Sequence, residues 1–152
     1  MSLSEGSDYV LAEGVTYHGN EGVGKGCMVG TQRLLLLIPT HVQTATMRRV
    51  TTRSWTLRGE KPADMIGNLA AESDISPDDL EEILREVDAR IPGARLFDLS
   101  EIGRLRVRTG FFSRGIYLNR KPSRIGGTGF PLRRADARAF ERFYRGHPAA
   151  IE

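Results

Sequence analysis

The stretch that decides the fold is Cys27-Met28-Val29-Gly30-Thr31-Gln32-Arg33-Leu34-Leu35-Leu36-Leu37-Ile38, which Pro39 ends. Its residues are typical of a β-strand, and the second half is continuously apolar. Such a run predicts a strand that is buried on both faces or lies at the centre of a sheet. The run is too short to cross a bilayer.

A glycine-rich segment, residues 19–26, comes directly before this stretch, and residues 9–18 before it alternate as a strand does. The segment predicts an exposed hairpin connection. Its Gly19-x-x-x-x-Gly24-Lys25 spacing matches most of a phosphate-binding loop, but that chemistry needs a Ser or Thr after the Lys and a helix beyond it. Gly26 and a β-like sequence stand there instead. A hairpin turn is therefore favoured, and no cofactor is expected.

Helical patterns occupy the middle of the chain. Pro62 opens a short helix, and Ser76 with Pro77 marks the start of a longer one that Pro92 ends. The longer helix carries one apolar stripe: Leu80, Ile83, Leu84, Val87 and Ile91. Residues 42–57, before these helices, are expected to form one or two further strands.

Strand patterns return after the helices, over residues 96–99, 104–108 and 111–119, with a loop at 126–129. A last amphipathic helix is expected over residues 135–145. Strands and helices therefore fall into separate blocks, which favours an α+β fold with mostly antiparallel pairing.

Length and composition set the broad class. The chain has 152 residues, 39% hydrophobic and 27% charged, with a single Cys. These values are typical of one globular domain and exclude disordered, collagen-like and disulfide-stapled classes. The N-terminus resembles no signal peptide, so a cytoplasmic location is expected, with peripheral membrane attachment as an option.

Charge is unevenly distributed along the chain. Residues 61–94 carry 3 Lys/Arg against 9 Asp/Glu, whereas residues 95–152 carry 13 against 5. Arg104, Arg106 and Arg108 alternate with apolar residues and should project from one face of a strand. Together with Lys25 they are the predicted ligand-binding residues, suited to an anionic surface or an acidic protein. The alternative is a solvated face, or one neutralised by the acidic helix (Asp78, Asp79, Glu82, Glu86).

Signatures of catalysis or metal binding are missing from the sequence, so no catalytic or metal-binding residue is assigned. A small enzyme that uses Cys27 or a histidine (His18, His41 or His147), alone or as a Cys/His pair, stays an alternative, because folding can bring such residues together. Non-specific nucleic-acid binding through the basic C-terminal half is another. The chain lacks the pattern of a specific nucleic-acid reader, because aromatic residues make up only 7% of it.

The segment from Gly26 to Leu36 resembles a phrase common in PH-like and GRAM-like domains, in which a glycine-rich hairpin leads into Thr-x-x-Arg-Leu and an apolar strand. Thr31, Arg33 and Leu34 match it. Residues 98–102, before the basic strand, and the terminal helix are similar to parts of the same pattern. The resemblance implies a half-open barrel of strongly bent antiparallel sheet, plugged by the last helix, in a binding or scaffold module.

The sequence thus predicts a flexible N-terminus (residues 1–8), one PH-like domain over residues 9–146 with a helical pair inserted at about 62–91, and a tail (147–152). The expected function is a non-catalytic interaction module that binds a protein partner or an anionic lipid surface. Self-association is a further option, and no membrane-spanning segment is expected.

Overall fold

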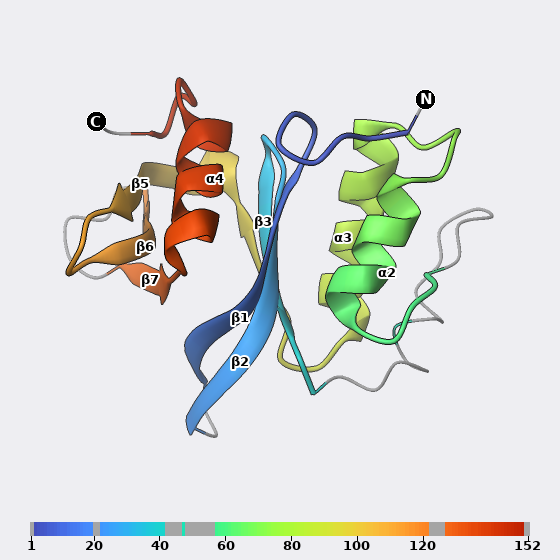
Figure 1. The fold of residues 1–152 in the computed structure, drawn as a ribbon, viewed down its shortest axis with the longest axis horizontal. Helices are drawn as coiled ribbons and strands as arrows, with labels where there is room; N and C mark the ends of the chain where they lie inside the picture. The colour runs from blue at the N-terminus through green and yellow to red at the C-terminus, as the bar shows by residue number, and fades with distance from the viewer. Residues whose placement is uncertain (1, 20–21, 42–46, 48–56, 122–126, 151–152) are drawn as a thin grey trace.

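The computed structural model describes residues 2–19, 22–41, 47, 57–121 and 127–150. The protein is a small α+β domain with three layers: a helical pair, a central four-stranded sheet, and a three-stranded sheet accompanied by the last helix (Figure 1). In the described ranges the seven strands form two separate antiparallel sheets and no closed barrel.

The four-stranded sheet has the order β1-β2-β3-β4, with β1 at Val10–Gly19, β2 at Gly22–Gly30, β3 at Leu34–Pro39 and β4 at Arg95–Asp98. Two expectations are corrected here. The glycine-rich segment does join two strands of a hairpin, but most of it is strand: β1 runs to Gly19 and β2 starts at Gly22, so Lys25 lies within a strand and not in a loop. Residues 27–38 do not form one strand, because a turn divides them into β2 and β3.

That turn is held by Thr31 and has no glycine at its centre. The Thr31 hydroxyl accepts a hydrogen bond from the backbone N–H of Leu34 (3.0 Å), and the Thr31 N–H donates to the Leu34 carbonyl (2.8 Å). Thr31 is buried and Leu34 is the first residue of β3. A side chain of this kind can replace a backbone turn.

β3 is buried on both faces, as its apolar run predicts. Leu34, Leu36 and Ile38 belong to the core under the helical pair, whereas Leu35 and Leu37 belong to the core between the two sheets. Successive side chains of a strand point to opposite faces, so one strand supplies both cores.

The helical pair consists of α2 (Pro62–Ala70) and α3 (Pro77–Arg90), which cover one face of the central sheet (Figure 1). Ser76 caps α3 as expected: its side chain accepts from the Asp79 N–H, and Asp79 accepts from the Ser76 N–H in return. The acidic face of α3 pairs with Arg33 of the turn, through Asp78 and Glu81. Residues 42–46 and 48–56, part of the expected strands, lie outside the described residues.

The second sheet has the order β5-β6-β7, with β5 at Ile102–Thr109, β6 at Arg114–Arg120 and β7 at Thr128–Pro131. Helix α4 (Arg134–Tyr144) packs against it and against β1. Phe140 and Tyr144 are fully buried there, which confirms the expected amphipathic helix. The expected strand over 111–119 begins only at Arg114, because Phe111 and Phe112 lie in the turn between β5 and β6.

Asp98 shapes the corner between the two sheets. It caps the short 3-10 helix η1 (Leu99–Glu101), and its carboxylate accepts from the hydroxyl (2.7 Å) and N–H (3.0 Å) of Ser100. These hydrogen bonds, with help from Arg85, hold the pKa of Asp98 below its ordinary value. The described helices include none that is long and apolar enough to cross a membrane.

We expect Asp98→Asn to lower the free energy of unfolding by about 1 kcal/mol near neutral pH. Because the folded pKa of Asp98 is depressed, its contribution is complete above the pKa of the unfolded chain and is lost as the pH falls through the folded value. The difference between variant and wild type should therefore shrink below about pH 4. Urea unfolding across this range measures it, with Glu60→Gln as an exposed control. If Asp98→Asn were still less stable than wild type at low pH, the stabilisation could not come from the ionised carboxylate of Asp98.

Candidate functional site

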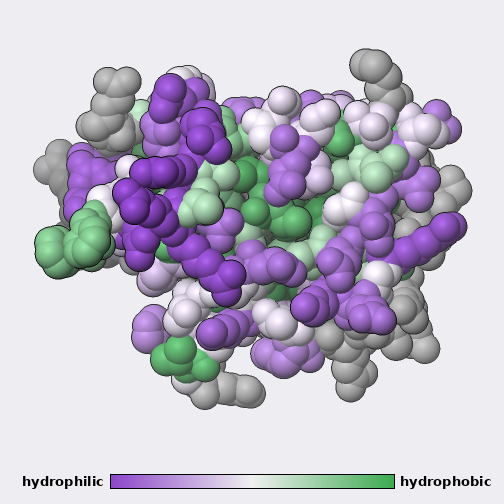
Figure 2. All heavy atoms as spheres, viewed as in Figure 1, coloured by the Kyte–Doolittle hydropathy of each residue, from purple (hydrophilic) through white to green (hydrophobic). Residues whose placement is uncertain are grey.

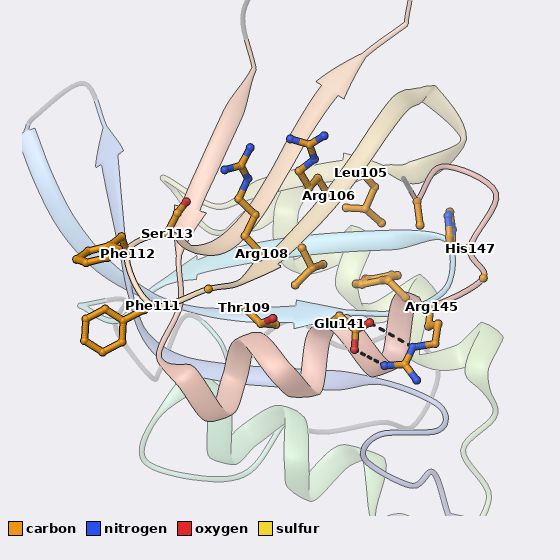
Figure 3. A pocket seen from close by; sticks show the side chains of 15 residues that line it. Leu105, Arg106, Arg108, Thr109, Phe111, Phe112, Ser113, Glu141, Arg145 and His147 are labelled. Carbon is orange, nitrogen blue, oxygen red and sulfur yellow. Dashed lines mark hydrogen bonds and ion pairs between the residues drawn. The ribbon is translucent and has the colours of Figure 1, made fainter. Parts of the chain in front are cut away.

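A groove of about 960 Å³ lies between β5 and α4. Its exposed apolar side chains are Phe111 and Phe112, with the half-buried Val107 next to them; the buried Leu105 and Tyr144 lie beneath, and Glu141 and Arg145 line its α4 side. Figure 3 shows His147 near one end of the groove and Phe111 and Phe112 at the other, where β5 turns into β6. The residues come from two stretches that lie far apart in sequence: β5 with its turn (105–113), and the end of α4 with the tail that follows it (141–150).

One wall of the groove is the free edge of β5. β5 pairs with β6 on one side only and is the edge strand of its sheet. The N–H of Leu105 points away from β6, since it donates to the carbonyl of Ala149 (2.8 Å). Main-chain groups alternate in direction along a strand, so those of Val107 and Thr109 point the same way. In the described residues no strand pairs with the edge at these two positions.

The chain's own tail already occupies the neighbouring edge position. Ala150 forms a parallel bridge with Leu105, and His147 holds the tail in place. The His147 Nδ1 accepts from the Ala149 N–H (3.0 Å), so Nε2 carries the proton and donates to the Gln32 carbonyl (2.8 Å). The edge of β5 therefore accepts added main chain in this fold.

Only some of the predicted ligand-binding residues lie at the groove. Arg106 and Arg108 line the groove, and Figure 3 shows their side chains on the side away from α4. Arg104 is exposed on the same strand but does not line the groove, and Lys25 is exposed on β2, in the other sheet. The structure thus brings two of the four predicted residues together at the groove.

The arginines of β5 are not neutralised by the acidic helix. α3 packs on β3 and β4, and its carboxylates Asp78, Glu81 and Glu86 pair with Arg33 or Arg90. Within the described ranges, none of Arg104, Arg106 and Arg108 forms an ion pair, although Arg108 lies over the ring of Tyr117 (5.8 Å to the centroid). Their positive charge is therefore open to an outside partner.

Tyr144 anchors the groove to the central sheet. Its hydroxyl donates to the Thr31 carbonyl (2.9 Å), and its ring packs edge-on against Phe143. Burial raises the pKa of the Tyr144 hydroxyl far above its ordinary value, so it remains a neutral donor. A side chain at Gly30 would collide with the Tyr144 hydroxyl, so this position needs glycine.

Phe111 and Phe112 are site residues that the sequence analysis missed. Their exposed fractions are 85% and 97%, and they stack edge to face with ring centroids 5.0 Å apart. Their position in a hairpin turn could have been suspected from Gly110 and Ser113 on either side. Aromatic residues favour strands, however, and that preference led to the wrong assignment.

The structure gives the enzyme alternative little support. Cys27 is buried under the helical pair, and burial, with the carboxylates of Glu13 and Asp64, raises the pKa of its thiol well above the ordinary value. His18 and His41 line a separate hollow, which Cys27 does not line, and His147 lies in the tail. The described residues contain no cluster of three or more metal-ligating side chains.

The three residues that match the PH-like and GRAM-like pattern stabilise the fold. Thr31 holds the turn, Arg33 binds α3, and Leu34 starts the doubly buried strand. No protein-family model matches the chain, and comparisons with curated proteins and with solved structures give no match. Any functional proposal therefore depends on the geometry described above.

Proposed function

We propose that the protein is a non-catalytic interaction module whose groove binds an extended, acidic segment of a partner protein as an added strand on β5. One observation carries the proposal: the described part of the tail adds main chain to this edge at Leu105, and no described strand pairs with Val107 or Thr109, which line the groove beyond it. Peptides commonly bind by adding a strand to an exposed sheet edge, with side-chain pockets giving specificity.

We also propose that the domain is a PH-like half-open barrel. Three features support this: β1 and β7 are in contact, β4 continues through η1 into β5, and α4 packs against both sheets near their shared core. Phe97 of β4 meets Phe130 of β7 edge to face across that core, 5.8 Å between centroids. On this view the helical pair is an insertion between β3 and β4. An intracellular binding role is consistent with this architecture.

The charges around the groove favour an acidic occupant. On an added strand, the residue opposite Val107 faces the α4 side of the groove, next to the half-buried Val107 side chain, and its two neighbours face the side of Arg106 and Arg108. The preferred segment therefore alternates acidic and apolar residues. A second copy of the chain fits less well, because edge-to-edge pairing centred on Val107 would set Arg106 opposite Arg108 of the other copy.

The alternatives have weaker support. A small enzyme would need a reactive Cys27 or a histidine cluster, and the buried thiol with its raised pKa argues against the first. Non-specific nucleic-acid binding would use stacked aromatic rings beside the arginines. On the arginine face of the sheet the described aromatic residue is Tyr117, whose ring Arg108 already covers, whereas the exposed Phe111 and Phe112 lie beyond this face, in the turn.

Val107→Pro tests the proposed strand addition. The Val107 N–H points away from β6, so proline removes an edge donor without breaking the β5–β6 pairing. Peptides of alternating acidic and apolar residues, selected from a displayed library, should bind this variant about five- to tenfold more weakly than wild type, the loss of one hydrogen bond. Fluorescence polarisation measures the affinity.

Val107→Thr, which keeps the N–H, is the matched control and should bind as wild type does. Circular dichroism and thermal unfolding should show that both variants fold. Amide chemical shifts should change at Val107 and Thr109 when peptide is added. The proposal fails if no peptide is selected, if Val107→Pro binds as tightly as wild type, or if the shifts move to another surface.

A further inference from the structure

The turn between β5 and β6, at one end of the groove, carries a second feature that strand addition to β5 does not use. Phe111 and Phe112 are two of the three large apolar side chains exposed in the described residues, the third being Val23. Figure 2 shows an apolar protrusion at the outer end of the second sheet, bordered by hydrophilic residues. Burying two phenylalanines is strongly favourable, so leaving both in water is costly for a protein without a partner there.

Basic side chains flank this protrusion. Arg108 lies two residues before the Gly110 that opens the turn, and Arg114 follows the turn directly, opposite Thr109 in the sheet. In the described part of the chain neither arginine has a carboxylate partner. An apolar tip flanked by arginines that form no ion pair suits the boundary between anionic lipid headgroups and acyl chains.

We propose that the β5–β6 turn docks the protein on an anionic lipid bilayer, with Phe111 and Phe112 inserted below the headgroups and Arg108 and Arg114 against the lipid phosphates. The shape of the site favours a bilayer over a protein partner. The two rings protrude from the narrow end of a hairpin, so a protein partner would need a cavity of matching shape. A fluid bilayer needs no such cavity to take up an apolar tip. This docking site shares Arg108 with the groove, but docking on a bilayer needs no strand added to β5.

Cosedimentation with phosphatidylcholine vesicles, with and without phosphatidylserine, tests the proposal. Wild type should bind the anionic vesicles, and bind them more weakly as salt rises. Phe111→Ser with Phe112→Ser should lower the partition coefficient about tenfold or more, because the apolar area is lost. Arg108→Gln with Arg114→Gln should lower it about tenfold or more on anionic vesicles only. Val23→Ser, an exposed apolar residue on the other hairpin, is the matched control and should change nothing.

A probe on the turn separates insertion from mere adhesion. In Phe112→Cys the new thiol is exposed whereas Cys27 is buried, so an environment-sensitive dye labels the turn selectively. Dye fluorescence should rise with anionic vesicles and be quenched by brominated lipids. The proposal is overturned if the double phenylalanine variant binds as wild type, if the dye does not respond, or if it responds to protein concentration without vesicles, which would indicate a protein contact. Val107→Pro should bind vesicles normally, so failure here and failure of strand addition are distinguishable.

Discussion

Leu36→Ala should lower the free energy of unfolding by about 3 to 5 kcal/mol and the Tm by about 10 °C. Leu36 lies in the middle of β3, is fully buried and points into the core under α2 and α3. Removing three carbons there loses their transfer free energy and leaves a cavity, because paired strands on both sides of β3 prevent collapse. Denaturant unfolding followed by circular dichroism measures the loss.

Leu35→Ala provides the comparison. Leu35 is also fully buried but belongs to the core between the two sheets, so it should cost a similar amount. Val23→Ala, on an exposed hairpin, should change stability by less than about 0.5 kcal/mol. If either leucine variant behaved like Val23→Ala, the two-sided burial of β3 would be wrong.

Tyr144→Ala should be comparably destabilising, at about 3 to 5 kcal/mol. The ring is fully buried between α4 and the β2–β3 turn, and its hydroxyl satisfies the Thr31 carbonyl. The variant should also lose peptide binding, because Tyr144 forms part of the groove. Thermal unfolding and polarisation with the selected peptides measure the two effects.

Tyr144→Phe separates the ring from the hydroxyl. It keeps the packing against Phe143 and removes only the donor to Thr31, so it should cost about 1 kcal/mol. A loss as large as that of the alanine variant would assign the energy to the hydrogen bond instead. A negligible loss in Tyr144→Ala would show that α4 is not anchored to the turn as described.

Local patterns predicted the elements whose signals lie within a few residues. The apolar run from Leu34 to Ile38 predicted a doubly buried strand, and Ser76 with Pro77 predicted the start of α3. The turn at Thr31 was missed because it is closed by a threonine hydroxyl rather than by glycine or proline. Phe111 and Phe112 were placed in a strand because their residue type outweighed the neighbouring turn signal.

The groove itself could not be predicted from the sequence. It forms where β5, with Val107, meets Tyr144 and the tail that follows it, and these two stretches are distant along the chain. Alternation predicted that the arginines of β5 share a face, but no local pattern says that β5 is an edge strand. Lys25 was added to this group on charge alone, and the fold places it in the other sheet.

The helical pair, which lies between β3 and β4 along the chain, is a structural necessity. The side chains of Leu34, Leu36 and Ile38 that it covers would otherwise form a broad apolar surface in contact with water on the central sheet. A chain shortened by removing these helices would therefore need polar side chains at these positions of β3, or another molecule to cover them.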